Sequence, residues 1–109
     1  MRRRVRTFSA LGDETRLSLL ARLGTGEPLS ISRLTHGLGQ SRQSITKHLR
    51  VLARAGLVRG ARRGRERCFA LRRDALDDAR QWLADLSRQW DVALGRLKRM
   101  LEREGAPKA

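Results

Sequence analysis

The chain has 109 residues, the length of one domain, and 25 Lys and Arg residues against 11 Asp and Glu residues give it a formal net charge of +14. A chain this short does not suit a multidomain enzyme, and a second copy would help a domain of this size bury its surface. The one cysteine excludes an intramolecular disulfide, the basic start lacks the apolar run of a signal peptide, and no run of about 18 apolar residues occurs. We therefore expect a soluble, cytoplasmic protein that binds a polyanion and no membrane.

The positive charge is confined to the first two thirds of the chain. Residues 1–73 hold 18 Lys or Arg and four acidic residues, whereas residues 74–109 hold seven of each. This division suggests one part that meets a polyanion and another part with a different task. General arginine enrichment over solvated faces is the alternative, and the position of the charges within the predicted elements must decide.

The chain begins with a basic arm that holds Arg2, Arg3, Arg4 and Arg6 and is expected to be disordered, and a short helix is predicted at residues 7–11. A second helix is predicted to begin after Asp13, because an Asp side chain can accept hydrogen bonds from the free N–H groups of a helix start. Its apolar residues fall on one side, and glycines end it: Leu17, Leu20 and Leu23, then Gly24 and Gly26.

Two helices joined by a tight turn are predicted next, at residues 29–38 and 41–55. The first has Ile31, Leu34 and Leu38 on one face. The second is expected to be capped by Ser41 and to end at Gly56 in a left-handed conformation. Its apolar stripe recurs at helical spacing, at Ile45, Leu49 and Leu52.

A β-hairpin is predicted at residues 57–71, with strands at 57–59 and 67–71 and an Arg-rich tip at 60–65. One long amphipathic helix is predicted at residues 74–104, and two shorter helices that meet at Gly95 are the alternative. The last residues, 105–109, are expected to be frayed. The apolar stripe of the long helix predicted at residues 74–104 includes Leu83, Leu86, Trp90, Leu94, Leu97 and Leu101.

These elements predict one domain over residues 1–109: a mainly α fold with a small β-hairpin, the winged helix-turn-helix, with a core at 7–73, a wing at about 57–71 and a C-terminal dimerisation helix at 74–104. In this fold the second helix of the motif reads base edges in the major groove, and the wing contacts the DNA backbone or minor groove. The polar face of residues 41–55 carries no acid and suits this role. We expect DNA contacts from Ser41, Arg42, Gln43, Ser44, Thr46, Lys47, His48 and Arg50, and from Arg62, Arg63 and Arg65 on the wing.

Two stretches carry a family resemblance: Leu-Gly-Asp-x-Thr-Arg at residues 11–16, and a pattern at residues 42–58 anchored by Thr46, His48, Leu49, Leu52 and Gly56. Over residues 8–101 the chain resembles the ArsR/SmtB family of bacterial transcriptional regulators. The resemblance implies a homodimer, joined through its first and last helices, that binds a palindrome in its own promoter and represses until a signal releases it. The interface residues implied are Phe8, Leu11, Leu83, Leu86, Trp90, Leu94, Leu97 and Leu101.

Metal sensing and catalysis are not expected. Where metal-sensing relatives have Cys, one residue, Cys and Asp, this chain has Ser30, Ser32 and Arg33, and it has no His after His48 for the second metal site of the family. No catalytic set or phosphate-binding loop is recognisable, so no metal, cofactor or enzymatic activity is predicted. The effector remains unassigned.

Three polar residues need separate interpretation. His36 and His48 are expected to be structural, with His48 packing or bonding near the backbone of its helix. Cys68 is expected on a wing strand, on the face opposite Phe69, as a small semi-buried residue; a thiol made reactive by neighbouring arginines is the alternative.

Two other function classes remain open. One is a protein-interaction adaptor whose winged helix docks an acidic partner, and the other is nonspecific nucleic-acid binding, which needs only charge. The polar face of residues 41–54 argues against the adaptor, because it lacks exposed apolar anchors.

Overall fold

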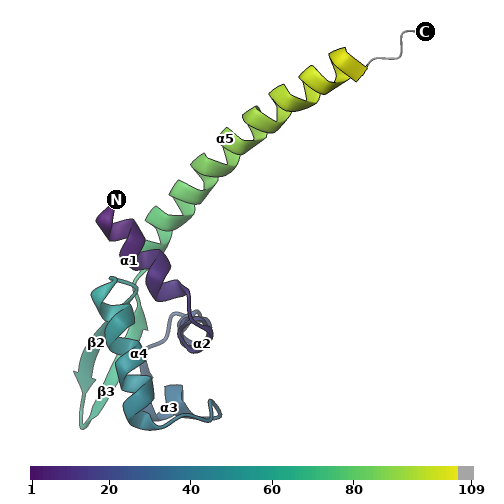
Figure 1. The fold of residues 1–109 in the computed structure, drawn as a ribbon. Coiled ribbons are helices and arrows are strands. Elements are labelled where there is room, and N and C mark those ends of the chain that lie inside the picture. Colours follow the sequence, from purple (N-terminus) through teal and green to yellow (C-terminus); the bar gives the residue numbers. More distant parts are fainter. Residues whose placement is uncertain (106–109) are drawn as a thin grey trace. The chain divides into compact units, whose positions relative to one another are not determined.

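The computed structural model describes residues 1–105, which form eight elements (Figure 1). They divide into two compact units, Met1–Ala79 and the residues from Arg80 onward. None of the helices in residues 1–105 is long and apolar enough to cross a membrane. In chain order the elements are α1 (Arg2–Leu11), α2 (Glu14–Leu23), β1 (Leu29–Ser30), α3 (Ile31–Thr35), α4 (Arg42–Arg54), β2 (Val58–Arg63), β3 (Glu66–Leu71) and α5 (Arg73–Gly105).

Helix α1 begins five residues earlier than predicted, so the expectation of a disordered basic arm is wrong. Arginine is a good helix former, and two contacts hold this segment in place. The Arg4 guanidinium donates through Nε to Asp78 Oδ2 at 3.2 Å, and the buried Thr7 donates its hydroxyl to the carbonyl of Arg3 at 3.1 Å. The other arginines of the arm are exposed on the helix surface.

Helix α2 begins as predicted, with the Asp13 carboxylate accepting from the backbone N–H of Arg16 at 3.0 Å. Its buried face differs from the prediction at one position. Leu20 and Leu23 are buried, but Leu17 is half exposed and Leu19 is buried in its place. Residues spaced by three positions, such as 17, 20 and 23, shift steadily around a helix. Position 17 therefore turns away from the core, and position 19 faces it.

The helix-turn-helix is formed by α3 and α4. Helix α3 is only five residues long, shorter than the predicted 29–38, because Leu29 and Ser30 pair with Phe69 and Cys68 as the short strand β1. The turn between the helices includes two glycines with positive φ, at 77° and 67°. Helix α4 lies one residue inside the predicted bounds at each end, with Ser41 as its N-cap, Ala55 as its C-cap and Gly56 at φ +76° just after.

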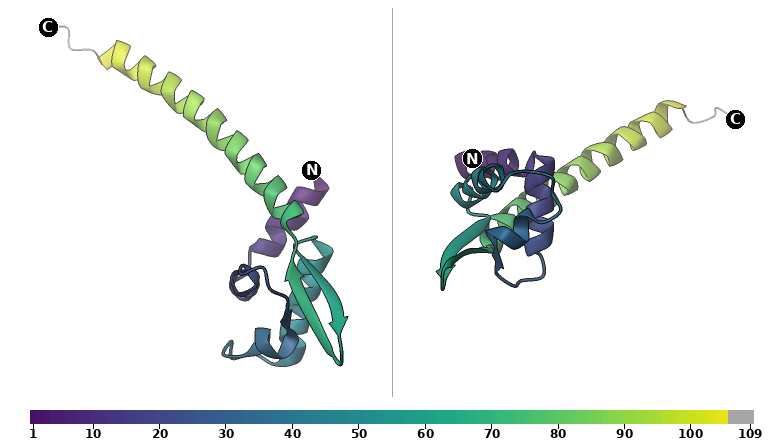
Figure 2. Two further views of the ribbon diagram at one scale, coloured as in Figure 1. Left: turned by 180° about the vertical axis from the view of Figure 1, so that it is seen from behind. Right: turned by 90° about the horizontal axis from the view of Figure 1, so that it is seen from below.

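The strands form an antiparallel sheet of order β1-β3-β2, one strand more than the predicted hairpin. The hairpin strands are longer and the tip shorter than predicted, because Gly60 lies inside β2 opposite Phe69 and only Gly64 has a positive φ in this segment. Figure 2 shows the hairpin projecting from the helices of the first unit. Cys68 is buried, as the simpler interpretation expected, and so is Phe69, because β3 is the central strand and is covered on both faces here.

One hydrophobic core lies between the helices and the sheet of the first unit. It includes buried side chains from α2, α3, α4 and the sheet, and Ala75 from the start of α5. Burial of these aliphatic side chains is the main source of stability and holds α4 with one face inward. Seven of them are the largest fully buried side chains: Leu19, Leu23, Leu34, Ile45, Leu49, Leu52 and Leu57.

Helix α5 is continuous through Gly95, so the alternative of two shorter helices is wrong. A glycine costs a helix interior only about 1 kcal/mol relative to alanine, which a helix of 33 residues can tolerate. The predicted fraying concerned residues 105–109; Gly105 is helical, and residues 106–109 lie outside the described part of the chain.

Candidate nucleic-acid interface

Helix α4 presents one polar face to solvent while its opposite face is buried. Ile45, Leu49 and Leu52 are completely buried, which fixes how the helix is rotated. A shallow hollow lies on the exposed side, and none of the five described residues that line it is acidic. They are Arg42, Gln43, Thr46, Lys47 and Arg50, all predicted to contact DNA. This face therefore offers guanidinium, ammonium and amide groups to a polyanion.

Two serines predicted to contact DNA make hydrogen bonds at the start of α4. The Ser41 hydroxyl accepts from the backbone N–H of Ser44 at 3.1 Å, and the Ser44 hydroxyl donates to Gln40 Oε1 at 2.7 Å. Gln40 in turn donates its side-chain N–H to Thr15 on α2. These bonds connect the start of α4 to the preceding turn and to α2. The sequence reasoning missed Gln40, because a long-range amide contact leaves no periodic signal.

His48 lies on the side of α4 that faces the start of α2. Its Nδ1 is 3.3 Å from Nη1 of Arg16 and 3.7 Å from Oδ2 of Asp13. The expectation that His48 bonds near its own helix backbone is therefore replaced by contacts with two side chains of another helix.

Arg16 joins three helices at this point. Its Nε donates to the carbonyl of Ala10 at 2.7 Å and its Nη2 donates to that of Ser9, so one side chain ties α1 to α2 while it contacts His48 on α4. The backbone N–H of Arg16 lowers the pKa of the Asp13 carboxyl, and His48 and the Arg16 guanidinium lower it further. The Asp and Arg of the Leu-Gly-Asp-x-Thr-Arg stretch thus hold α4 in position.

The wing carries its predicted arginines on the exposed end of the hairpin. Arg62 and Arg63 are in β2 and Arg65 is in the turn, where Gly64 adopts φ +62°. Across the hairpin Arg62 lies opposite Arg67, and Arg63 lies opposite Glu66. The register therefore gives Arg63 an acidic cross-strand neighbour.

Arg67 was not predicted to contact DNA, although it is exposed on the same hairpin. Its guanidinium lies over the Phe69 ring, 5.5 Å from the ring centroid, a cation–π contact that orients the side chain. A Cβ added at Gly60 would lie 3.0 Å from this ring, so the ring would have to shift by a few tenths of an ångström to admit a side chain there.

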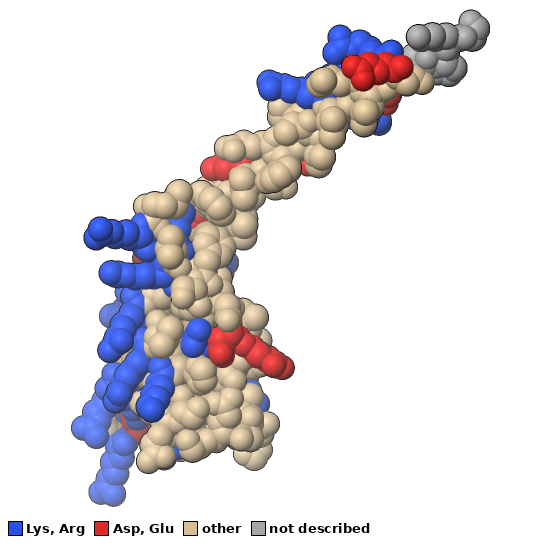
Figure 3. Space-filling model, in the orientation of Figure 1, with Lys and Arg blue, Asp and Glu red and all other residues tan. Residues whose placement is uncertain are grey.

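Many cations of the first unit lie along one edge of the face that Figure 3 shows. Figure 3 shows Lys and Arg side chains along the edge formed by α1, α4 and the β2–β3 hairpin. Such a concentration of one sign attracts a polyanion and raises the rate of its association.

The residues predicted to form a dimer interface are found in both units. In the first unit, Phe8 is half-buried and Leu11 packs against the core. In the second unit, considered by itself, Leu86 is half-buried and the others are 49–60% exposed on α5: Leu83, Trp90, Leu94, Leu97 and Leu101.

At the position where metal-sensing relatives have their first cysteine, Ser30 has a structural role. Its hydroxyl accepts from the backbone N–H of Arg33 at 3.2 Å and caps α3. Ser32 and Arg33 are exposed on the same short helix. Residues 1–105 contain no group of three or more His, Cys, Asp or Glu side chains that could hold a metal ion.

A helix-turn-helix followed by a two-stranded wing, with an acid-free cationic face on its second helix, defines a winged helix-turn-helix DNA-binding protein. Comparison with known proteins agrees. Residues 11–61 match a helix-turn-helix domain family. The chain is 35% identical over 100 residues to the HTH-type transcriptional regulator Rv2034 of Mycobacterium tuberculosis, covering 92% of this chain and 90% of that one.

Solved structures carry the same assignment. An ArsR-like transcriptional regulator from Rhodococcus sp. RHA1 is 35% identical, with a TM-score of 0.77 over 90% of this chain and 92% of that one. A homodimeric winged helix-turn-helix DNA-binding domain from Mycobacterium bovis, at 22% identity, shares the fold, with a TM-score of 0.61 over 86% of this chain and 83% of that one. The chain belongs to the ArsR family of helix-turn-helix transcriptional regulators, a family of DNA-binding proteins rather than enzymes.

Proposed function

We propose that this regulator is a homodimeric repressor that binds a palindromic operator, with one α4 helix in the major groove of each half-site. The observation that carries the proposal is the polar face of α4, which is exposed, rich in two-pronged hydrogen-bonding groups and free of acids. Exposed charge alone would support binding to any duplex. Amide and guanidinium groups on a rigid helix also support reading of base edges.

The residues of α4 divide between two kinds of contact. Gln43 and Arg50 have the geometry for two-pronged hydrogen bonds to adenine and guanine edges, respectively. Lys47 is a point charge suited to phosphate, and Arg62, Arg63 and Arg65 on the wing suit the backbone or a narrow minor groove. The Thr46 hydroxyl donates to the carbonyl of Arg42 at 2.8 Å, so toward DNA it can only accept a hydrogen bond, for example from a base amino group.

The apolar stripe of α5 supports the dimer. Five of its large side chains are about half exposed in the second unit, an arrangement that a monomer in water does not favour. Residues 74–109 carry no net charge, so two copies of this segment would not repel each other. The homodimeric relative from Mycobacterium bovis is consistent with such an assembly. Phe8 and Leu11 of α1 are proposed as further interface residues.

The proposal includes no metal effector. Serine hydroxyls and a guanidinium at positions 30, 32 and 33 are poor ligands for soft metal ions, and Ser30 is used as a helix cap. The proposed repressor therefore responds to another signal or to its own concentration.

The test is a binding titration with the DNA upstream of the protein's own gene and a shuffled duplex of the same composition. Arg50→Ala should weaken binding to the specific duplex by about 1–3 kcal/mol and relax its base preference. Arg63→Ala should weaken binding to both duplexes and flatten the salt dependence by about one phosphate contact. Each variant is the control for the other.

Two results would contradict the proposal. An equal effect of Arg50→Ala on both duplexes would remove the base-reading role and favour nonspecific binding. No binding to either duplex at low salt would favour the adaptor that docks an acidic protein.

A further inference from the structure

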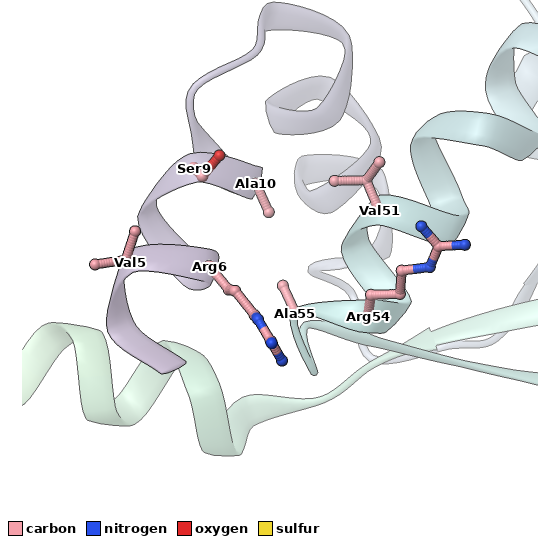
Figure 4. Close-up of a pocket in the computed structure, with 7 residues that line it drawn as sticks. All are labelled: Val5, Arg6, Ser9, Ala10, Val51, Arg54 and Ala55. Carbon is pink, nitrogen blue, oxygen red and sulfur yellow. The ribbon is translucent and has the colours of Figure 1, made fainter. Parts of the chain in front are cut away.

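A second hollow lies between α1 and the C-terminal half of α4, outside the residues predicted to contact DNA. Its volume is about 610 Å³, and Figure 4 shows its lining. Four of its seven described lining residues are apolar and two are arginines. None of the seven is acidic. They are Val5, Arg6, Ser9 and Ala10 of α1, and Val51, Arg54 and Ala55 of α4 and its C-cap.

Arg54 continues the polar stripe that α4 presents to solvent. Residues 43, 47, 50 and 54 are separated by four, three and four positions, so they lie on one face of the helix. The stripe from Gln43 to Arg54 is about 16 Å long at about 1.5 Å per residue, and the major groove is about 12 Å wide. A helix that lies in the groove therefore extends far enough to bring Arg54 to the backbone at the groove's border.

Arg6 adds a second cation beside this end of α4. It is exposed on α1, and Figure 4 shows its side chain extending from α1 past Ala55, while Arg54 points away on the other side of the hollow. Neither guanidinium has an ion-pair partner among residues 1–105. Arg4 and Arg16, by contrast, are engaged with Asp78 and with backbone carbonyls.

We propose that Arg6 and Arg54 bind phosphates of the DNA strand that borders the major groove occupied by α4, one from each side of the hollow. The inference rests on the proposed function in one respect, the placement of α4 in the groove. It makes α1 a part of the DNA-binding surface and extends the footprint beyond the bases that Gln43 and Arg50 read.

Two pairs of substitutions that remove the same charge from different helices distinguish phosphate contacts from an effect of net charge alone. The test pair is Arg6→Gln with Arg54→Gln, and the control pair is Arg99→Gln with Arg103→Gln, two exposed residues of α5 in the second unit. Both pairs remove two positive charges from exposed helical positions. Thermal melting by circular dichroism checks that both fold like the parent.

The measurement is fluorescence anisotropy of labelled upstream and shuffled duplexes, titrated with protein at several salt concentrations between about 50 and 200 mM. The Arg6/Arg54 pair should reduce the slope of log K against log salt by about 1.8 per bound protomer, because each phosphate contact contributes about 0.9. The ratio of the affinities for the two duplexes should stay as in the parent, because phosphates carry no sequence information. The control pair should leave the slope unchanged.

Three outcomes would overturn the inference. One is an unchanged slope in the Arg6/Arg54 pair, as expected if the hollow takes a small organic anion instead of DNA. Another is an equal reduction in both pairs, which would reflect net charge alone. The third is a loss of duplex preference in the folded Arg6/Arg54 pair, which would place these arginines at base edges. The proposed function fails by a different measurement: the parent protein would bind the upstream and shuffled duplexes with equal affinity.

Discussion

Gly56 shows how one residue decides where the recognition helix ends. It follows the last turn of α4 at φ +76°, and the chain then enters the buried start of β2. The backbone N–H of Leu57 donates to the carbonyl of Leu52 at 3.0 Å and closes the end of the helix. A left-handed residue is needed at this position, and glycine adopts that conformation without the steric cost of a Cβ.

Gly56→Ala should therefore destabilise the protein by about 1–2 kcal/mol, as read from a urea unfolding curve. The cost comes from φ and not from space, because an added Cβ would meet only the Ala75 methyl, at 3.9 Å. Gly95→Ala is the matched control, since Gly95 lies inside α5 and alanine should stabilise a helix interior by about 1 kcal/mol. Equal unfolding midpoints for Gly56→Ala and the parent would contradict the assigned backbone strain.

At this scale the sequence predicts local chemistry well and long-range contacts poorly. The caps at Asp13 and Ser41 follow from side chains that bond to backbone only three residues ahead. Gln40 was missed because its partner, Thr15, is brought close only by tertiary packing. Arg67 lies two residues before Phe69 on β3, so strand alternation puts both side chains on one face, a local signal that could have found the contact. The predicted DNA contacts of individual residues stay predictions.

At the scale of elements, α4 was predicted to within one residue at each end because three signals coincide: a capping serine, a strict apolar stripe and a terminal glycine. The start of α1 and strand β1 lack such signals. The start of α1 is held by the contact between Arg4 and Asp78, and β1 is two residues that pair with β3. Both depend on partners far away in the sequence, so local patterns could not predict them.

The apolar stripe of α5 leads to a prediction about assembly. Leu97→Asp should convert the proposed dimer to a monomer, because a charge in an apolar interface loses its hydration without gaining a partner. Light scattering should then give half the parent mass.

Val92→Asp is the matched control on the same helix. Val92 is 56% exposed and Leu97 is 50% exposed, but Val92 lies about 200° around the helix from Trp90, on the side opposite the stripe. This variant should keep the parent mass. A dimer that survives Leu97→Asp, or one that both variants dissociate, would move the interface away from the stripe.

At the scale of the whole molecule, the uneven distribution of charge follows the division of the chain into parts. The entire net charge of +14 falls in residues 1–73, which build the helix-turn-helix and the wing, while the neutral remainder forms nearly all of α5. The sequence predicted this division because net charge along a chain needs no tertiary information. The inclusion of α1 among the basic elements required the structure, because the arm was expected to be disordered.

The central claim, a dimer that reads two half-sites with its two α4 helices, is tested most directly by selecting bound duplexes from a random-sequence pool with the purified protein and sequencing them. The account predicts an inverted repeat whose half-site centres lie about 10 base pairs, or about 34 Å, apart, the spacing of two recognition helices on one face of DNA. A selected pool with a single unpaired site, or with no enriched sequence, would contradict it.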